Sequence, residues 1–214
     1  MQVNKIQPNP AFTSLRNPIK TEKFLYKNEL VTMREALPSD ILDVARDMKK
    51  WMSQSYKYEY CMGKEPKHQK AREIFQAIDK NQWLQEIKQH LVDMLKKPEA
   101  SLLVARNQKN KLIGYATREN MNGAQVPTGI IENIHLELPY RDGELGKHLL
   151  DKITQTAQNT FDEVVVGSYS LGDRSIYRNA GYKFIDSEQY RKLLNARYDG
   201  VNVNDFWLKK DINH

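Results

Sequence analysis

The residues best suited to chemistry lie in one short turn between an apolar strand and an amphipathic helix. The turn covers residues 140–146, and Lys147 follows where the helical pattern begins. The first amides of a helix have no carbonyl partner within it, and the aligned peptide dipoles place partial positive charge there. Such a turn can bind a phosphate through its main chain, and Arg141 and Lys147 would add charge. The sequence therefore predicts an anion site at this turn.

This turn also resembles the pyrophosphate-binding signature of the GNAT acetyltransferase superfamily, [Gln/Arg]-x-x-Gly-x-[Gly/Ala]. The segment reads Arg141-Asp142-Gly143-Glu144-Leu145-Gly146, in which Arg141 and Gly146 match. Glu144 stands where the family has its middle glycine, and Gly143 lies one place earlier. A carboxylate there would repel a pyrophosphate unless it turns to solvent or pairs with a base.

Three further segments resemble the same family in the same order along the chain. Residues 34–40 are similar to its first strand and helix start, residues 174–182 to its Leu-Tyr-x-x-x-Gly-Phe segment, and residues 205–210 to its closing strand. The resemblance spans residues 30–210. It implies an α/β fold with a mixed, mostly antiparallel sheet flanked by helices, whose fourth and fifth strands splay apart.

The hydrophobic periods are those of such a fold. Predicted strands cover residues 30–33, 101–105, 111–117, 129–138, 161–167, 182–185 and 203–211. Predicted helices cover residues 39–52, 71–78, 84–95, 145–157, 170–179 and 187–195. Residues 1–29 show no sustained period. We expect them to form an extension, disordered or packed on the domain, before a single domain over residues 30–214.

The resemblance implies that acetyl-CoA, as co-substrate, lies between the strands at 129–138 and 161–167. The first of these strands would pair with the pantetheine arm through its main chain. Ser170 stands where the family often has Asn, although capping of the next helix is the favoured interpretation, and Asp173 is a second departure from the family pattern. The expected cofactor-binding residues are Ile134, His135, Leu136, Arg141, Asp142, Gly143, Glu144, Leu145, Gly146, Lys147 and Ser170.

The implied reaction is direct attack of an amine on the thioester. A base must take the amine proton, and a strand amide near Leu136 would polarise the carbonyl. Tyr177 matches the family tyrosine that protonates the leaving thiolate; the alternative is a core or rim aromatic. Glu132 is the predicted base because strand alternation places it on one face with Ile134 and Leu136, unless a bulge intervenes. The alternative is an exposed or structurally paired glutamate, and His135 falls on the opposite face.

Composition excludes several other classes. The 214 residues are 40% hydrophobic and 28% charged, the mean hydropathy is -0.72, and Cys61 is the only cysteine, so neither a disulfide scaffold nor a cysteine-rich zinc site is expected. No apolar run approaches the roughly 18 residues of a membrane span, and no secretory pattern begins the chain. We expect a cytoplasmic protein without a metal site.

Charge leaves the partners open. The net charge is +6, and residues 1–34 carry +4 of it. The favoured function is an acetyl-CoA-dependent N-acetyltransferase. The first alternative is an inactive GNAT-like domain that binds CoA or a protein partner, suggested by Glu144 and Asp173, and the second is a basic nucleic-acid-associated protein. The resemblance implies that residues 53–68 line the acceptor site. The identity of the acceptor, small molecule or protein, and the oligomeric state are not predicted.

Overall fold

The computed structural model describes residues 20–57, 66–77, 80–141, 143–167, 171–185 and 207–212, with positions 61, 64, 188 and 192. The strands are β1 (Glu22–Tyr26), β2 (Glu29–Glu35), β3 (Ser101–Arg106), β4 (Leu112–Asn120), β5 (Thr128–Leu136), β6 (Glu163–Gly167), β7 (Lys183–Phe184) and β8 (Trp207–Asp211). The helices are α1 (Ile41–Tyr56), α2 (Pro66–Ala77), α3 (Lys80–Lys96), α4 (Glu144–Gln155) and α5 (Leu171–Asn179), with 3-10 turns at Pro38–Asp40 and Leu138–Tyr140.

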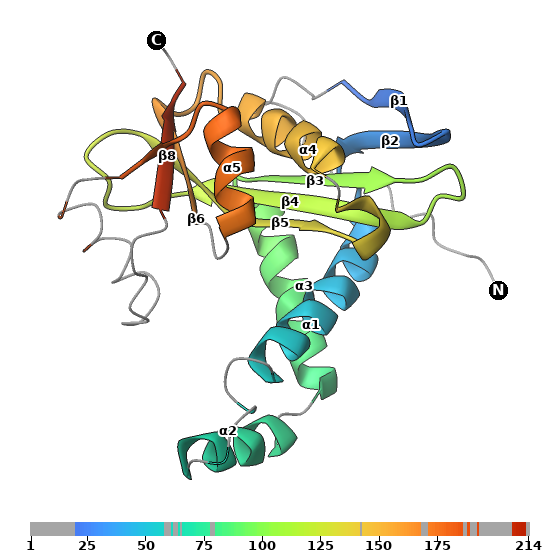
Figure 1. The fold of residues 1–214 in the computed structure, drawn as a ribbon, viewed down its shortest axis with the longest axis vertical. Helices are drawn as coiled ribbons and strands as arrows, with labels where there is room; N and C mark the ends of the chain where they lie inside the picture. The colour runs from blue at the N-terminus through green and yellow to red at the C-terminus, as the bar shows by residue number, and fades with distance from the viewer. Residues whose placement is uncertain are drawn as a thin grey trace.

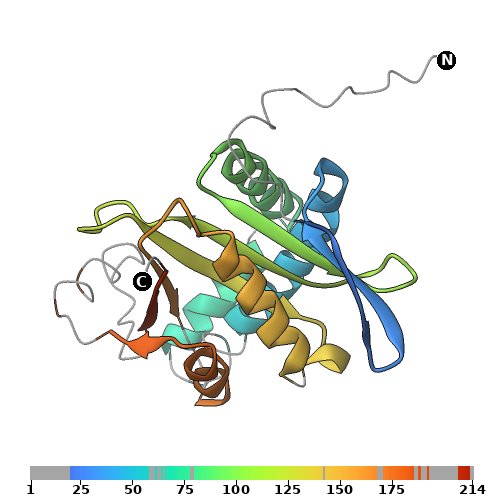
Figure 2. The same ribbon diagram turned by 90° about the horizontal axis from the view of Figure 1, so that it is seen from above.

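The strands form one sheet in the order β1-β2-β3-β4-β5-β6-β8-β7 (Figures 1 and 2). Neighbouring strands are antiparallel except for β5 and β6, which are parallel. This confirms the predicted mixed, mostly antiparallel α/β fold. The predicted strand at 203–211 is described from Trp207 onward, and most of the predicted helix at 187–195 lies outside the described residues.

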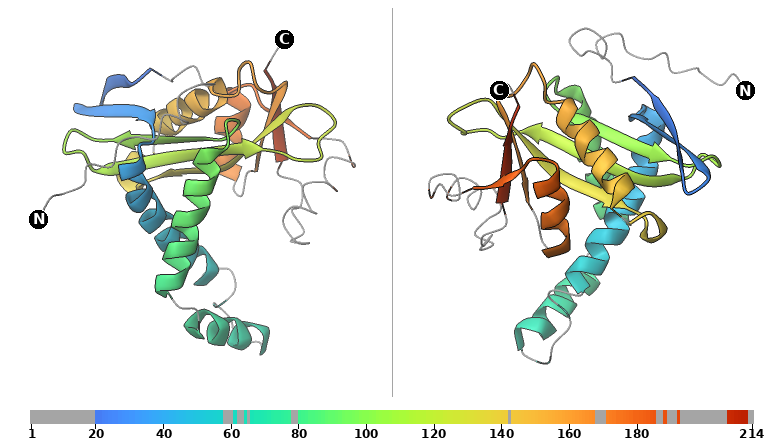
Figure 3. Two further views of the ribbon diagram at one scale, coloured as in Figure 1. Left: turned by 180° about the vertical axis from the view of Figure 1, so that it is seen from behind. Right: turned by 45° about the horizontal axis from the view of Figure 1, so that its top comes forward.

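Helices cover both faces of the sheet (Figures 1 and 3). On one face, α4 buries Leu145, Leu149 and Ile153 against the sheet. On the other face, α1 and α3 pack on residues of β3 and β4 that include Val104 and Tyr115. Every residue of β3 is buried, because a strand covered on both sides has no face left for solvent.

An N-terminal hairpin extends the sheet beyond the predicted domain boundary. β1 lies within the range assigned to an extension, yet it pairs with β2 from Glu22↔Met33 to Tyr26↔Glu29. Lys27 and Asn28, the two residues of the turn, both have positive φ (48° and 64°). That is the backbone of a two-residue turn that matches strand twist. The expected extension, disordered or packed on the domain, thus contains residues that pair within the sheet, whereas residues 1–19 lie outside the described part.

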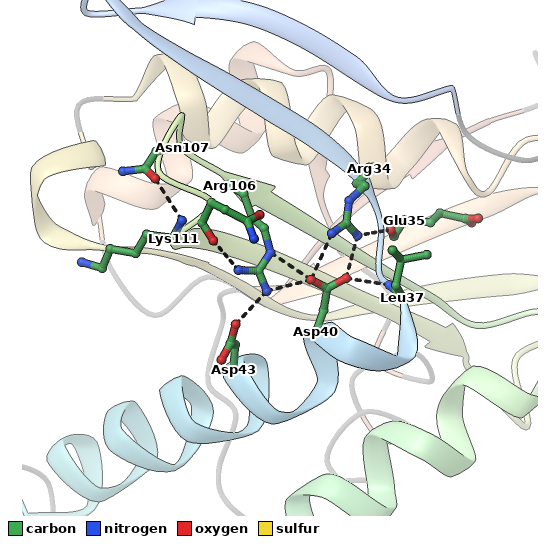
Figure 4. Close-up of polar contacts among 9 residues, drawn as sticks. Arg34, Glu35, Leu37, Asp40, Asp43, Arg106, Asn107 and Lys111 are labelled. Atoms are coloured by element: carbon green, nitrogen blue, oxygen red, sulfur yellow. Dashed lines mark hydrogen bonds and ion pairs between the residues drawn. The ribbon is translucent and has the colours of Figure 1, made fainter. Parts of the chain in front are cut away.

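A charged network fixes the start of α1 (Figure 4). Asp40 is 1% exposed and accepts hydrogen bonds from Arg34 Nη1 (2.6 Å), the Leu37 amide (2.6 Å) and Arg106 Nε (2.9 Å). Arg106 also contacts Asp43 at 2.8 Å. The network ties α1 to β2 and β3, so the helix leaves the sheet in a fixed direction. Together with α3 it forms an arm that carries α2 at its far end (Figures 1 and 3).

Candidate active site

The site begins where β5 and β6 separate. The two strands pair only from Thr128↔Glu163 to Ile131↔Val166, whereas β5 remains paired with β4 as far as Leu136. The second half of β5 therefore has one edge facing the gap between the strands. This is the predicted splay of the fourth and fifth strands counted from residue 30.

A cavity of about 360 Å³ occupies this region. Its walls come from β5, the start of α4, the end of β6, α5 and α1. The predicted site residues that line it are Glu132, Ile134, His135, Leu136, Arg141, Gly143, Gly146 and Tyr177. The structure thus brings most of the predicted residues to one hollow.

The free edge of β5 presents hydrogen-bonding groups to the gap. The Glu137 amide donates to the Ile113 carbonyl on the β4 side at 2.9 Å. Because successive residues of a strand point their backbone groups to opposite edges, the amides of Leu136 and Ile134 face the gap. The Leu136 carbonyl accepts from Arg141 Nε at 2.7 Å on that side. An extended ligand could pair with this edge as an added strand would.

The predicted anion turn has the backbone it requires. Gly143 is the N-cap of α4 with φ 99°, and its carbonyl accepts from the Lys147 amide at 2.9 Å. The amides of Glu144, Leu145 and Gly146 lack an intrahelical acceptor because they begin the helix, and Gly143 has no side chain that could cap them. A Cβ at Gly143 would meet nothing within 4 Å, so the φ angle and not space favours glycine.

The other residues predicted at this turn lie around it. Leu145 is buried in the core, so only its main chain can face a ligand. Glu144 and Lys147 are exposed, and neither lines the cavity; Lys147 lies 3.9 Å from Asp151. Asp142 and Ser170 lie outside the described residues, as does the side chain of Asp173.

The strand-alternation argument for Glu132 is wrong, because a bulge intervenes. Thr117 pairs with Asn133 and Arg118 with Ile131, which leaves Glu132 with no residue opposite it on β4. The bulge reverses the alternation. Ile131 and Leu136, five positions apart, consequently lie in the same core under α4. Glu132 still lines the cavity, but its face cannot be read from parity with Ile134 and Leu136.

Tyr177 lies on α5 at the cavity wall. It is partly buried, packs against the core under α4 and meets the Tyr182 ring edge-on at 6.1 Å between centroids. The packing holds the ring in place while one part of the side chain lines the hollow. The position is compatible with a proton donor and also with a rim aromatic.

Sequence reasoning missed a polar pair on the opposite wall. His135 Nε2 lies 3.0 Å from Asp47 Oδ2 on α1. The hydrogen bond with His135 outweighs the effect of burial and holds the pKa of Asp47 below its usual value. The His135 ring also stacks on Tyr115 at 5.5 Å and meets Trp51 edge-on at 6.4 Å. The available signal was the i, i+4 spacing of Asp47 and Trp51, which places both on one side of a helix.

Two features are absent from the described part of the chain. None of its groups of His, Cys, Asp and Glu side chains has three members placed to hold a metal ion. None of its helices combines the length and hydropathy that crossing a membrane demands.

A sequence-family comparison decides the family. The model of the acetyltransferase (GNAT) domain matches residues 62–196, more than half of the chain. The protein is a member of the GNAT acetyltransferase family. A comparison with curated proteins found no match.

Solved GNAT structures share the fold at low identity. An acetyltransferase of this family from Staphylococcus aureus Mu50 is 16% identical, with a TM-score of 0.55 over 86% of this chain and 99% of the other. A predicted acetyltransferase from Clostridium acetobutylicum, solved with acetyl-CoA, is 18% identical, with a TM-score of 0.54 over 73% and 92%. Phosphinothricin acetyltransferase from Sinorhizobium meliloti, also with acetyl-CoA, is 12% identical, with a TM-score of 0.53 over 85% and 88%.

Proposed function

We propose that this GNAT protein transfers an acetyl group from acetyl-CoA to the nitrogen of an amine. One observation carries the proposal: the unpaired edge of β5 and the N-terminus of α4, which begins at Gly143 without a side-chain cap, both face one cavity. The first suits an extended amide-bearing arm and the second a diphosphate. Family members of the same fold are solved with acetyl-CoA, which supports this choice of ligand.

Acetyl-CoA would supply an acetyl group already activated as a thioester. The Leu136 amide, facing the gap, would donate a hydrogen bond to the carbonyl oxygen as negative charge develops there. The amine nitrogen forms the new C–N bond, the C–S bond breaks, and the amine loses one proton to a base. Tyr177 would give its phenolic proton to the departing sulfur and regain one from solvent.

One argument for the alternative function, an inactive GNAT-like domain that binds CoA or a protein partner, is weakened. It was suggested by a carboxylate at the position of the family's middle glycine, but Glu144 is exposed and does not line the cavity. A carboxylate directed to solvent at the first turn of a helix also interacts favourably with the helix dipole.

The test is release of free thiol from acetyl-CoA in the presence of an amine panel: a polyamine, an arylalkylamine, an aminoglycoside, lysine and an unblocked peptide. Tyr177→Phe should slow turnover about 10- to 100-fold, at the low end of general acid catalysis. Tyr26→Phe is the matched control, because it removes the hydroxyl of a buried tyrosine that does not line the cavity and keeps the ring that contacts Tyr140. Calorimetric binding of acetyl-CoA without turnover of any acceptor would favour the inactive module instead.

A further inference from the structure

Asp47 and His135 join two hollows of the molecule. His135 lines the cavity described above, and Asp47 lines a neighbouring open cleft of about 310 Å³. The two side chains are in hydrogen-bond contact at 3.0 Å, and the exposed fraction is 13% for His135 and 19% for Asp47. The pair is therefore mostly buried, with its imidazole toward the cavity and its carboxylate toward the cleft.

We propose that His135 is the base that takes the proton of the acceptor amine, and that Asp47 positions it. This inference rests on the proposed function and assigns to His135 the role that the sequence suggested for Glu132. An imidazole that donates its Nε2–H to Asp47 keeps a lone pair on Nδ1, the nitrogen that can accept a proton. A carboxylate bound to the first nitrogen fixes the tautomer and stabilises the imidazolium that forms.

The surroundings hold the imidazole in place. Tyr115 stacks on one side of the ring and Trp51 meets it edge-on, and both also line the cavity. Asp47 remains ionised because its pKa is lowered, chiefly by the hydrogen bond with His135. A histidine with one nitrogen bound and its ring packed against two aromatics is preorganised for proton transfer in a single orientation.

Tyr115 gives an independent indication that a ligand binds here. Its side chain is 1% exposed, and its hydroxyl has no hydrogen-bond partner within the described part of the chain. Burial raises the pKa of Tyr115, so the hydroxyl stays neutral and can both donate and accept. An unsatisfied buried hydroxyl in a cavity wall beside His135 would be satisfied by a polar group of the acceptor.

The step balances without a further reactant. The amine nitrogen attacks the carbonyl carbon, and its proton passes to His135 Nδ1 as the C–N bond forms. The imidazolium, held by Asp47 through Nε2–H, then returns the Nδ1 proton to solvent once the product has left the cavity, which restores the starting tautomer. Sulfur leaves with the electrons of the C–S bond and takes its own proton from Tyr177.

Several other charged groups surround the pair and affect its titration. Lys50 on α1 and Arg141 in the turn both act on Asp47, and they lower its pKa further. Glu137, two residues after His135 and just beyond the end of β5, is paired with Lys111 at 2.6 Å. Glu132, on the other side, interacts electrostatically with His90.

The kinetic test compares His135→Gln, Asp47→Asn and Glu132→Gln in the thiol-release assay, using whichever amine of the panel the protein acetylates. His135→Gln should lower kcat about 100-fold or more. Asp47→Asn should lower it about 10-fold and move the acidic limb of the pH profile, and Glu132→Gln should cost less than His135→Gln. Calorimetry should show unchanged acetyl-CoA affinity in all three variants. His148→Gln, a surface histidine on α4 against Phe24, is the control.

Nitrogen NMR of the wild-type histidines gives a second readout that needs no acceptor. The neutral imidazole of His135 should carry its proton on Nε2, and Asp47→Asn should weaken that tautomer preference. A larger loss in Glu132→Gln than in His135→Gln, or an imidazole protonated on Nδ1 at pH 8, would overturn the assignment. If the wild type acetylates no amine, the proposed function itself fails, and the tautomer still shows whether His135 has the form of a base.

Discussion

Replacing Asp40 by Asn should remove the anchor of α1 and with it the alignment of the cavity wall that α1 supplies. The carboxylate is buried between two guanidinium groups, and Arg106 Nη2 contacts it at 2.7 Å in addition to the Arg106 Nε bond. Asparagine has the same shape but only one acceptor oxygen and no charge. The variant would leave Arg34 and Arg106 without their shared counter-ion.

The magnitude follows from the burial of the partners. The side chain of Arg106 is 9% exposed and that of Arg34 is 21% exposed. Removing one member of a buried ion pair typically costs about 3–5 kcal/mol. Asp43 still reaches Arg106 at 2.8 Å from a 44% exposed position, so we expect the lower end of that range. About 3 kcal/mol in a protein of this size corresponds to a drop in Tm of roughly 6–12 °C.

The loss should depend on pH with a definite sign. Burial raises the pKa of Asp40, but the hydrogen bonds from Arg34, the Leu37 amide and Arg106 outweigh it, and the pKa lies below the usual value near 3.8. A folded-state pKa below the unfolded one contributes stability above the unfolded value and loses it as pH falls through the folded value. The difference in Tm between wild type and Asp40→Asn should therefore be full at pH 7 and narrow below about pH 4.

Circular dichroism melts at pH 7 and pH 3.5 measure both effects, with Asp93→Asn as the control. Asp93 lies on the exposed face of α3 and pairs with Lys96 at 2.7 Å. An exposed pair of this kind contributes little, so its removal should leave the Tm almost unchanged. A drop of less than about 2 °C for Asp40→Asn at pH 7, or an equal drop for both variants, would refute the idea that the network anchors α1.

Three further predictions concern the helix start and the α3 surface. Glu144→Gln should bind acetyl-CoA several-fold more tightly in calorimetry, more so at low salt, because it removes a like charge from the anion site; equal affinities would place Glu144 outside the field of the diphosphate. Gly143→Ala should lower the free energy of unfolding by about 1–2 kcal/mol, since its φ of 99° strains any other residue; an unchanged melt would count against that strain. The hydrogen bond with Glu119 raises the pKa of His90 above 6.5. The contribution of this ion pair to the free energy of unfolding is therefore full below pH 6.5 and declines as pH rises through the raised pKa. His90→Gln should flatten that part of the stability profile.

The residues close together in sequence were the ones that the sequence placed well. The anion turn, the β5 strand and the start of α4 are contiguous, and one change of period from strand to helix defines them. Gly143 and Gly146 then fall on the same wall because a helix start and the strand before it cannot separate far. Local periodicity is sufficient there, since the chain itself fixes the geometry.

The N-terminal hairpin was missed because its pattern is short and half exposed. In β1, Leu25 is exposed while Tyr26 is buried, so a single period-2 cycle carries the signal. The useful indication was the Lys27-Asn28 pair, because asparagine tolerates the positive φ of a two-residue turn. The hairpin also braces the site: Glu29 accepts a hydrogen bond from Tyr140 at 2.6 Å, just before the anion turn.

The bulge at Glu132 lies beyond the reach of period-based reasoning. It arises from the pairing of β4 with β5, in which Thr117 and Arg118 face residues two positions apart. One extra residue in a strand leaves the hydrophobic pattern almost unchanged but reverses every face assignment after it. A parity argument for a catalytic residue is therefore secure only where the partner strand is known to keep register.

The two walls of the cavity come from different parts of the chain, and this difference affects how the choice of acceptor could vary. The wall expected to face acetyl-CoA comes from one continuous segment, β5 through the start of α4. The opposite wall comes from α1, which contacts His135 through Asp47 and is tied to the sheet at its start by Asp40. The direction of α1 thus sets the position of Asp47 and Trp51, and with them the width of the acceptor side. If the proposed function holds, variation in the α1–α3 arm would alter which amine fits without disturbing the anion turn, so acceptor choice and acetyl-CoA binding should respond to separate sets of substitutions.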